Sequence, residues 1–502
     1  MKITPFADIY LEGITVRFGP CPKGSKFMRI TNKIIQNNSL NNINTNKQLE
    51  DQLSTMLSSN KKIARPSDDP IIALRSLRLR TSVNQVTQYV EKNVEDAKSW
   101  LTVTEDAIDT LSDIIGDIRK QYVKGTSDTL KPEDRTIITD NLEALAAEIY
   151  NTGNADFAGR SVFTGYRTDT TLTYQKQETI QYTDITQDQS NLTIDSVTYV
   201  QQGATENDVE VFDIARVRLA YDKLDAVTPR IENLVTTSSV TYTVRTVNQA
   251  NDPYAEVVAN DNDIIFVPET GELLFGKNVA ATPDDISEIT VKYDKTNWAK
   301  GDLRPEHYFD CKDITNNKTY SSHGGEIEYN IGVNQSLRIN TSADECFSHN
   351  IVRDLQDVIE SIKEVNDIEA TIKKLKEDLE ALPETDTTGR AAVQTKLDAA
   401  NKAYTFINNK MHTLFSKAIT KADGYLDRNN VALTDCGTRS KRLDLIENRL
   451  DTQLDSLKEL KSENEDCDLA ETAIQMKSAE YSYNASLMAT SKILQETLLN
   501  YI

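Results

Sequence analysis

The stretch KKIARPSDDPIIALRSLRLR, residues 61–80, lies between two long helical patterns and decides how the chain is divided. Pro66 disfavours the helical conformation at Arg65, so the preceding helix has to end before this point. Pro70 suits the first turn of a helix, where its missing N–H costs nothing. The stretch therefore predicts a turn between two helices, one that fixes geometry and carries no chemistry.

The residues between the two prolines favour the same interpretation. Ser67 or Asp69 can cap the second helix with a side-chain oxygen. The negative charges of Asp68 and Asp69 suit the positive end of that helix. A metal site on the two aspartates is the alternative, but the sequence offers no third ligand nearby.

Three arginines follow in an otherwise acidic chain, at Arg75, Arg78 and Arg80. A solvated helix face is the simplest interpretation of such a cluster. The sharper alternative is an interface with an acidic neighbouring subunit.

The bulk composition narrows the class of protein. The 502 residues carry a formal net charge of −22. That length has room for two to four domains. No excess of Lys or Arg exists to neutralise phosphates, which argues against a nucleic-acid partner. No run of eighteen apolar residues and no cleavable secretory signal is visible, so we expect no membrane partner.

The residues that usually carry chemistry are scattered. The five cysteines share no CxxC spacing, and the four histidines form no HExxH motif. We therefore expect no disulfide framework, no metal or cofactor site, and isolated buried cysteines. Acidic pairs such as Asp284–Asp285 lack a nearby His or Cys, so we expect no enzyme.

The N-terminal third is helical in pattern after an atypical start. Residues 1–27 have Gly and Pro punctuation and no helical period, and they read as an extension or a wrongly assigned start before Met28. Apolar residues then recur at intervals of three or four from Leu79 to Tyr122, which is typical of a coiled coil or long bundle helix. A third helix is predicted to open near Pro132.

The middle of the chain changes in texture. From about residue 170 to residue 341 it is rich in Thr, Val, Tyr and Asp. Apolar residues alternate with polar ones over 240–244, 289–293 and 327–333, which indicates half-buried strands. The sequence PETG at 268–271 predicts a hairpin turn.

Helix returns after about residue 350. A helical hairpin is predicted over about 351–425, interrupted by PETDTTG at 383–389. Two further helices are predicted, one around Leu443–Leu457 and one from Leu469 to the end of the chain. The last has an apolar stripe at Met476, Tyr483, Leu487 and Leu494, with Leu498 and Leu499 beyond it. We expect this stripe to be an interface, with the heptads between Leu79 and Tyr122 or a neighbouring subunit as partner.

These patterns predict an elongated α+β fold. Long N- and C-terminal helices pack as a coiled-coil or bundle core, and a β-rich outer domain is inserted between them. The expected parts are an extension, a helical core segment, an outer domain, a helical hairpin and a second helical core segment, with the boundaries 1–27, 28–168, 169–348, 349–428 and 429–502.

Several stretches carry a family resemblance: MRITNKIIQNN at 28–38, KKIARPSDDP at 61–70, GRSVFTGYRTDT at 159–170, and the segments 437–460 and 470–502. In this order they resemble the type 3 flagellar hook-associated proteins, the FlgL-like hook–filament junction proteins of the flagellin superfamily. VNQSLRINTSADECF at 333–347 resembles them more weakly. Flagellin is the rival within the superfamily, but Pro66 and Pro70 depart from its usual sequence at this position.

The resemblance implies a structural subunit of the bacterial flagellum, in a ring of identical subunits at the hook–filament junction. It implies a flagellin-like fold, extracellular location, and type III export without a cleaved signal. The implied partners are the type 1 hook-associated protein, flagellin and an export chaperone. Flagellin itself, or a non-flagellar coiled-coil scaffold, is the alternative. Disorder of the free ends before assembly would couple folding to polymerisation.

Overall fold

The computed structural model describes the backbone of residues 32–499 except 128–129, 204–207, 239 and 322–324, and side chains from 33 to 492 within that span. The expected extension 1–27 and the expected start at Met28 lie outside the described residues. The chain divides into two compact units: residues 1–83 with 456–502, and residues 84–455.

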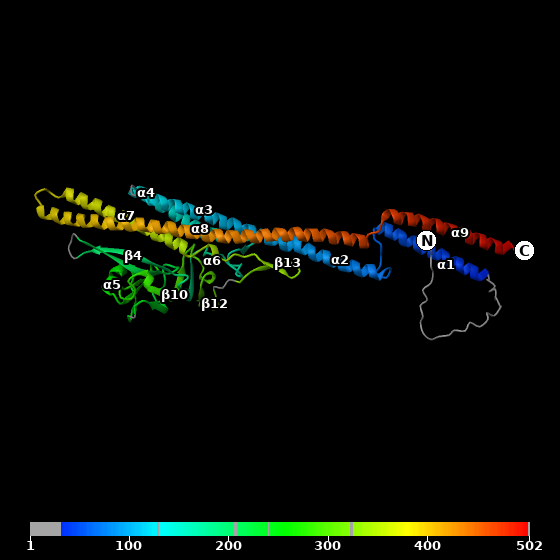
Figure 1. Cartoon of the computed structure of the whole chain (residues 1–502), viewed down its shortest axis with the longest axis horizontal. Helices are drawn as coiled ribbons and strands as arrows, with labels where there is room; N and C mark the ends of the chain where they lie inside the picture. The colour runs from blue at the N-terminus through cyan, green and yellow to red at the C-terminus, as the bar shows by residue number, and fades with distance from the viewer. Residues whose placement is uncertain (1–31, 128–129, 204–207, 239, 322–324, 500–502) are drawn as a thin grey trace, which may run out of the picture. The chain divides into compact units, whose positions relative to one another are not determined.

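The first unit is made of helices from both ends of the chain. It contains α1 (Asn32–Ser59), the start of α2 (Pro70–Gln88), the end of α8 (Thr387–Glu465) and α9 (Leu469–Leu499). Helices α1 and α9 lie side by side (Figure 1). The Asn46 amide on α1 donates to the Ser486 hydroxyl on α9 at 2.8 Å.

The expectation that the C-terminal helix packs on the heptads of 79–122 in the same chain is therefore wrong. The heptads of 79–122 pack on α8, while α9 packs on α1. The reason is that α8 is long enough to cover the apolar face of those heptads. Only the short segment 466–468 then separates α8 from α9.

In the second unit, α2 continues without a break into a six-residue π-helix, Tyr89–Val94, and then into α3 (Glu95–Gly125). The gap in the apolar period at Thr104 is filled by a buried hydroxyl that donates to the Trp100 carbonyl at 2.9 Å. Helix α3 lies along α8, with Lys98 paired to Glu447 at 3.1 Å.

The remaining helices of this unit are α4 (Pro132–Thr152) and α7 (Asn350–Ala381), which runs beside the first part of α8 (Figure 1). The predicted hairpin is present, with Ile372 on α7 packed in one cluster with Leu397 and Ala400 on α8. Its second arm does not stop near residue 425, because α8 continues as one helix of 79 residues. The expected boundary at 428/429 and the separate helix at Leu443–Leu457 both fall inside α8.

One five-stranded sheet has the order β12-β11-β3-β10-β6. Its strands are β3 (Glu178–Asp188), β6 (Arg230–Thr236), β10 (Ile286–Trp298), β11 (Asp310–Asp313) and β12 (Lys318–Tyr320). All neighbours in this sheet are antiparallel.

A second five-stranded sheet has the order β4-β5-β9-β8-β7. Its strands are β4 (Thr193–Gln202), β5 (Val209–Arg218), β7 (Thr243–Thr246), β8 (Asp263–Val267) and β9 (Glu272–Phe275). Only β7 and β8 pair in parallel among these neighbours. Helix α5 (Pro253–Ala259) packs on this sheet. The short elements of the region are α6 (Ala343–Cys346), β1 (Asp156–Phe157), β2 (Arg160–Ser161), β13 (Glu328–Gly332), β14 (Gln335–Arg338) and the 3-10 turns Gln249–Asn251, Pro283–Asp285 and Pro305–His307.

The strand predictions are confirmed in part. PETG forms the turn between antiparallel β8 and β9, with Gly271 at a φ of 66° where a side chain would meet the Tyr221 carbonyl. Residues 289–293 lie in β10, and 327–333 overlap β13. The alternation over 240–244 predicts a strand that begins too early, because β7 begins only at Thr243.

Buried ion pairs join the second sheet to α7. Arg216 on β5 pairs with Glu272 on β9 at 2.7 Å and with Asp357 on α7 at 2.9 Å. Arg218, 1% exposed, pairs with both Asp354 and Asp357. Burial alone would raise the pKa of Asp357, but the charges of the two arginines outweigh it and hold that pKa at about 2.

Two of the stretches that carry the family resemblance meet in this unit. The rings of Phe163 and Phe347 pack edge to face with centroids 4.9 Å apart. The Ala343 N–H donates to the Phe163 carbonyl at 3.0 Å. The segments 159–170 and 333–347 therefore form one structural connection between the helices and the sheets.

Three of the four cysteines that the structure describes are buried, as predicted. Cys311, Cys346 and Cys436 are buried free thiols, and Cys467 is half-buried. Cys21 lies outside the described residues.

Candidate assembly site at the chain ends

The turn after α1 is built as the sequence predicts. Asp69 caps α2, because its Oδ1 accepts from the backbone N–H groups of Ile71 and Ile72 at 2.9 and 3.1 Å. Asp68 serves the turn itself, accepting from the Arg65 N–H at 2.8 Å. Pro70 is the first residue of α2. The two aspartates thus accept hydrogen bonds from the backbone of the turn and of α2.

A short antiparallel bridge ties this turn to the segment between α8 and α9. The Lys62 N–H donates to the Glu465 carbonyl at 2.7 Å, and the Cys467 N–H donates to the Asn60 carbonyl at 3.2 Å. Asn60 adopts a left-handed φ of 55°, which Asn tolerates better than most residues. The two ends of the chain are joined here through their backbones.

One buried carboxylate lies beneath this bridge. Glu465 is 3% exposed and accepts from Arg80 at 2.6 and 2.8 Å, from the Ser76 hydroxyl and from Lys61. The hydrogen bond from Arg80 is the main reason that the pKa of Glu465 falls to about 2. Hydrogen bonding to Asp466 in turn raises the pKa of Lys61. Arg80 therefore forms an ion pair within its own chain and is not part of a free basic surface.

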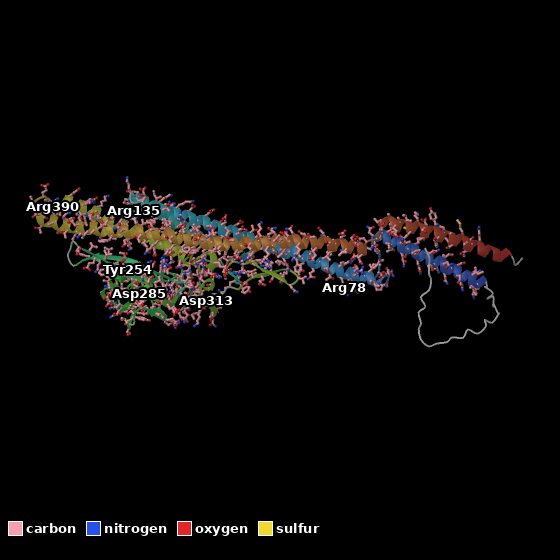
Figure 2. All side chains as sticks on the ribbon, viewed as in Figure 1. Arg78, Arg135, Tyr254, Asp285, Asp313 and Arg390 are labelled. Atoms are coloured by element: carbon pink, nitrogen blue, oxygen red, sulfur yellow. The ribbon has the colours of Figure 1, made fainter. Side chains whose placement is uncertain are left out.

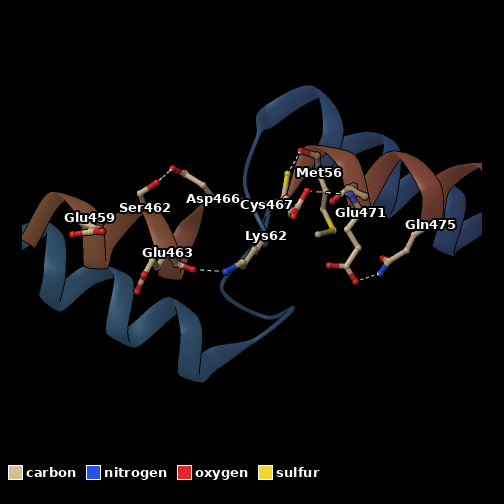
Figure 3. Close-up of a pocket in the computed structure, with 11 residues that line it drawn as sticks. Met56, Lys62, Glu459, Ser462, Glu463, Asp466, Cys467, Glu471 and Gln475 are labelled. Atoms are coloured by element: carbon tan, nitrogen blue, oxygen red, sulfur yellow. Dashed lines mark hydrogen bonds between the residues drawn. The ribbon is translucent and has the colours of Figure 1, made fainter.

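An open groove of about 640 Å³ lies beside the bridge (Figure 3). It has five carboxylates and one lysine among its lining residues, which makes it strongly acidic. The lining residues are Met56, Lys62, Glu459, Ser462, Glu463, Asp466, Cys467, Asp468, Glu471, Thr472 and Gln475.

The outward side of α2 combines apolar and basic residues. Ile71, Leu74 and Leu77 are 74%, 54% and 60% exposed. Arg75 and Arg78 are exposed beside them, and neither forms an ion pair with a residue that the structure describes. Arg78 is labelled on this helix in Figure 2. Large exposed apolar side chains at neighbouring positions of one helix are a typical mark of an interaction surface.

Helix α9 has an apolar stripe that the sequence analysis missed. Ile474, Tyr481 and Met488 are each more than 70% exposed and lie seven residues apart. Such spacing keeps all three on one side of the helix. Of the predicted stripe, Met476 and Tyr483 are half-buried, whereas Leu487 is 41% exposed. The side chains of Leu494, Leu498 and Leu499 lie outside the described residues.

A metal site and a membrane-spanning helix are two other features for which the described part of the chain can be compared. Among these residues, no three His, Cys, Asp or Glu side chains come together in a way that could hold a metal ion. None of the helices described here is both long and apolar enough to cross a membrane. What the chain ends offer is a set of exposed apolar and charged helix faces, which can make contact with other proteins.

The class of protein is given by the N-terminal helices. Residues 30–168 match the bacterial flagellin N-terminal helical region, which comprises α1 to α4 and the segment that follows. The chain therefore carries a flagellin-superfamily region.

The relatives that this chain matches include both hook-associated proteins and flagellins. Over 144 residues the chain is 28% identical to flagellar hook-associated protein 3 of Salmonella typhimurium, which covers 28% of this chain and 45% of the relative. The match to the Escherichia coli protein of the same name is 27% over 145 residues. Flagellin of Bacillus subtilis is 30% identical over 149 residues, covering 28% of this chain and 48% of the relative. The chain thus spans less than half the length of these relatives, and the predicted resemblance is confirmed at the level of the superfamily.

Solved structures of flagellar hook-associated proteins align over more of the chain, but at lower sequence identity. A putative flagellar hook-associated protein from Vibrio parahaemolyticus covers 80% of this chain and 100% of its own, at 12% identity and a TM-score of 0.36. Flagellar hook-associated protein 3 from Legionella pneumophila covers 77% of this chain and 97% of its own, at 13% identity and a TM-score of 0.31.

Proposed function

We propose that this protein is a structural subunit of the bacterial flagellum at the hook–filament junction. The observation that carries the proposal is the flagellin N-terminal helical region paired, through α1 and α9, with the C-terminal end of the same chain. Assembly would bury the exposed apolar residues of α2 and α9. Full burial of one such side chain contributes roughly 1.5–3 kcal/mol before ordering costs.

The partners follow from this role. Identical subunits would form a ring, with the type 1 hook-associated protein on one side and flagellin on the other. Export without a cleaved signal, binding of an export chaperone and an extracellular location belong to the same proposal. The turn at 65–70 would fix the geometry of the helices, and Arg75 and Arg78 would face a neighbouring subunit.

A deletion strain tests the proposal. Cells without this gene are expected to keep their hooks, to lack filaments, and to release unpolymerised flagellin into the medium. Electron microscopy of the cells and an immunoblot of the medium measure both. Normal filaments on the deletion strain would refute the junction role.

Flagellin is the second candidate, because the identity to Bacillus subtilis flagellin is as high as the identity to the hook-associated proteins. The same strain separates the two. If this chain were the filament subunit, its deletion would also remove filaments, but no flagellin-like protein would accumulate in the medium. Purified filaments would then consist mainly of this chain.

A further inference from the structure

We infer that the outward face of α2 in one copy of this chain docks into the acidic groove of a second copy. The inference rests on the proposed role as an assembling subunit and names the two surfaces that meet. Both surfaces lie within the same compact unit, formed by residues 1–83 and 456–502.

The first surface is defined by helical spacing. Ile71, Leu74, Arg75 and Arg78 recur at positions i, i+3, i+4 and i+7, so they share one side of α2. All four are exposed. The opposite side carries Ser76 and Arg80, which hold Glu465 of the same chain. The outward face therefore lies opposite the side of α2 that binds Glu465 and is exposed for contact with another molecule.

The second surface has complementary charge. Glu459 and Glu463 lie one helical turn apart on α8, are exposed and line the groove together with Glu471 on α9. Met56 adds an apolar side chain to the lining of the groove, which Ile71 or Leu74 of another copy could contact. Two arginines one turn apart on the α2 face match two glutamates one turn apart on the groove.

Charge also argues for a second copy over an unrelated protein. The chain has a net charge of −22, so copies repel one another unless a local basic surface meets a local acidic one. A face that binds a different surface of the next copy gives a head-to-tail contact, which closes into a ring or continues as a helix. Exposed ion pairs add little affinity but fix orientation and register, while the apolar residues supply affinity.

Sedimentation velocity on the full-length protein tests the inference in low salt, from low to high micromolar concentration. The wild-type protein is expected to self-associate. The variants Arg75→Glu/Arg78→Glu and Glu459→Lys/Glu463→Lys should each weaken self-association by about tenfold or more. An equimolar mixture of the two variants should recover it, because each reversed surface then meets its complement. Circular dichroism shows whether each variant is folded.

The matched control is Lys176→Glu/Lys318→Glu, which makes the same charge change at exposed lysines of the sheet-bearing unit. It should leave association unchanged. A monomeric wild-type protein throughout the range, or a mixture that fails to associate, would overturn the inference. So would an effect of the α2 variant without any effect of the groove variant, since the α2 face would then bind a different surface of the second copy. These results are independent of the deletion strain, so the junction role can stand if the docking contact fails.

Discussion

At Glu465, a single carboxylate receives donors from two segments that are almost four hundred residues away in the sequence. Arg80 and Ser76 approach from α2, and Lys61 approaches from the turn before it. Because the donors bind the charged form, the fold favours ionisation of Glu465. This residue therefore makes the pairing of the chain ends sensitive to acid.

The expected consequence is a loss of stability on acidification. The folded-state pKa of about 2 lies below the ordinary value of 4.5, so the stabilisation is complete above about pH 4.5 and is lost as the pH falls towards 2. Glu465→Gln should reduce the local stability at neutral pH by about 1–3 kcal/mol, a range reduced because Arg80 and Lys61 are partly exposed. It should also remove most of the dependence on pH in this range.

Hydrogen exchange of peptides covering 58–66 and 462–470, corrected for intrinsic rates between pH 3 and 7, measures this effect. Glu463→Gln is a matched control, because Glu463 is exposed nearby and contributes only its backbone carbonyl to Lys62. An equally steep acid dependence in Glu465→Gln would contradict the assignment.

Among whole elements, β5 and α7 are joined in an unusual way for a sheet–helix contact. Arg216 and Arg218 carry their charges into a buried site, where Asp354 and Asp357 neutralise them. Asp354 is also bound by Lys421 at 2.8 Å and by the Tyr425 hydroxyl at 2.5 Å, both on α8. One network therefore connects a strand with two helices, and each member depends on the others.

Breaking this network from one side should be costly. Arg218→Met keeps much of the side-chain volume but removes the buried cation that Asp354 and Asp357 share, leaving only Lys421 and Arg216 to neutralise them, and we expect a loss of about 3–5 kcal/mol. Thermal unfolding followed by the fluorescence of Trp100 and Trp298 measures it. Arg230→Met is the control, since Arg230 is 64% exposed and should change stability by less than about 1 kcal/mol. Similar melting of both variants would show that the buried pairs do not hold the sheet to α7.

The heptad stripe of α9 leads to a different prediction, about assembly. Ile474→Gln, Tyr481→Gln and Met488→Gln combined should leave the fold nearly unchanged, because all three side chains are exposed. The same variant should lower the number of filaments per cell strongly, since it removes apolar surface that assembly would bury.

Electron microscopy of cells that carry the triple variant, with circular dichroism of the purified protein, checks both parts. Replacing the exposed polar residues Ser478, Asn484 and Ser491 with Ala is the matched control on the same helix. Normal filament numbers with the triple variant would show that this stripe does not contribute to assembly.

For the molecule as a whole, the order of segments in the chain separates two tasks. Helices from both ends of the sequence pair with each other, α1 with α9 and α3 with α8. The strands of the sheets all lie in one continuous segment of the chain between α4 and α7. The helical pairs use their own apolar faces, so they do not need the sheets to find their partners.

Removal of the segment that contains the sheets tests whether the helices pair without it. A chain that joins residue 168 to residue 348 through a short linker should retain the helical circular dichroism of its remaining residues. It should also be exported and incorporated at the hook tip. Asp357 would then face water, so the loss of its arginines would carry no burial penalty. Failure to incorporate despite normal export and a normal helical spectrum would show that the sheets take part in attachment.

Elements with local signals could be predicted from the sequence. A helix end before Pro66, a helix start at Pro70, a cap at Ser67 or Asp69 and a hairpin turn at PETG each depend on the backbone preferences of a few neighbouring residues. The α+β class and the helical ends followed from periodicity, which is a property of burial on one side of an element.

The partners of the segments could be seen only in the folded chain. An apolar stripe such as that of α9 needs burial but does not specify against what, so the sequence left 79–122 as a candidate where the fold uses α1. Likewise no local pattern shows that Arg80 serves Glu465, or that Arg218 reaches Asp354. The exposed stripe at Ile474, Tyr481 and Met488 could be recognised only after the other side of α9 was seen to be covered. Local sequence preferences act over a few residues, whereas pairing depends on which surfaces remain once every other contact is made.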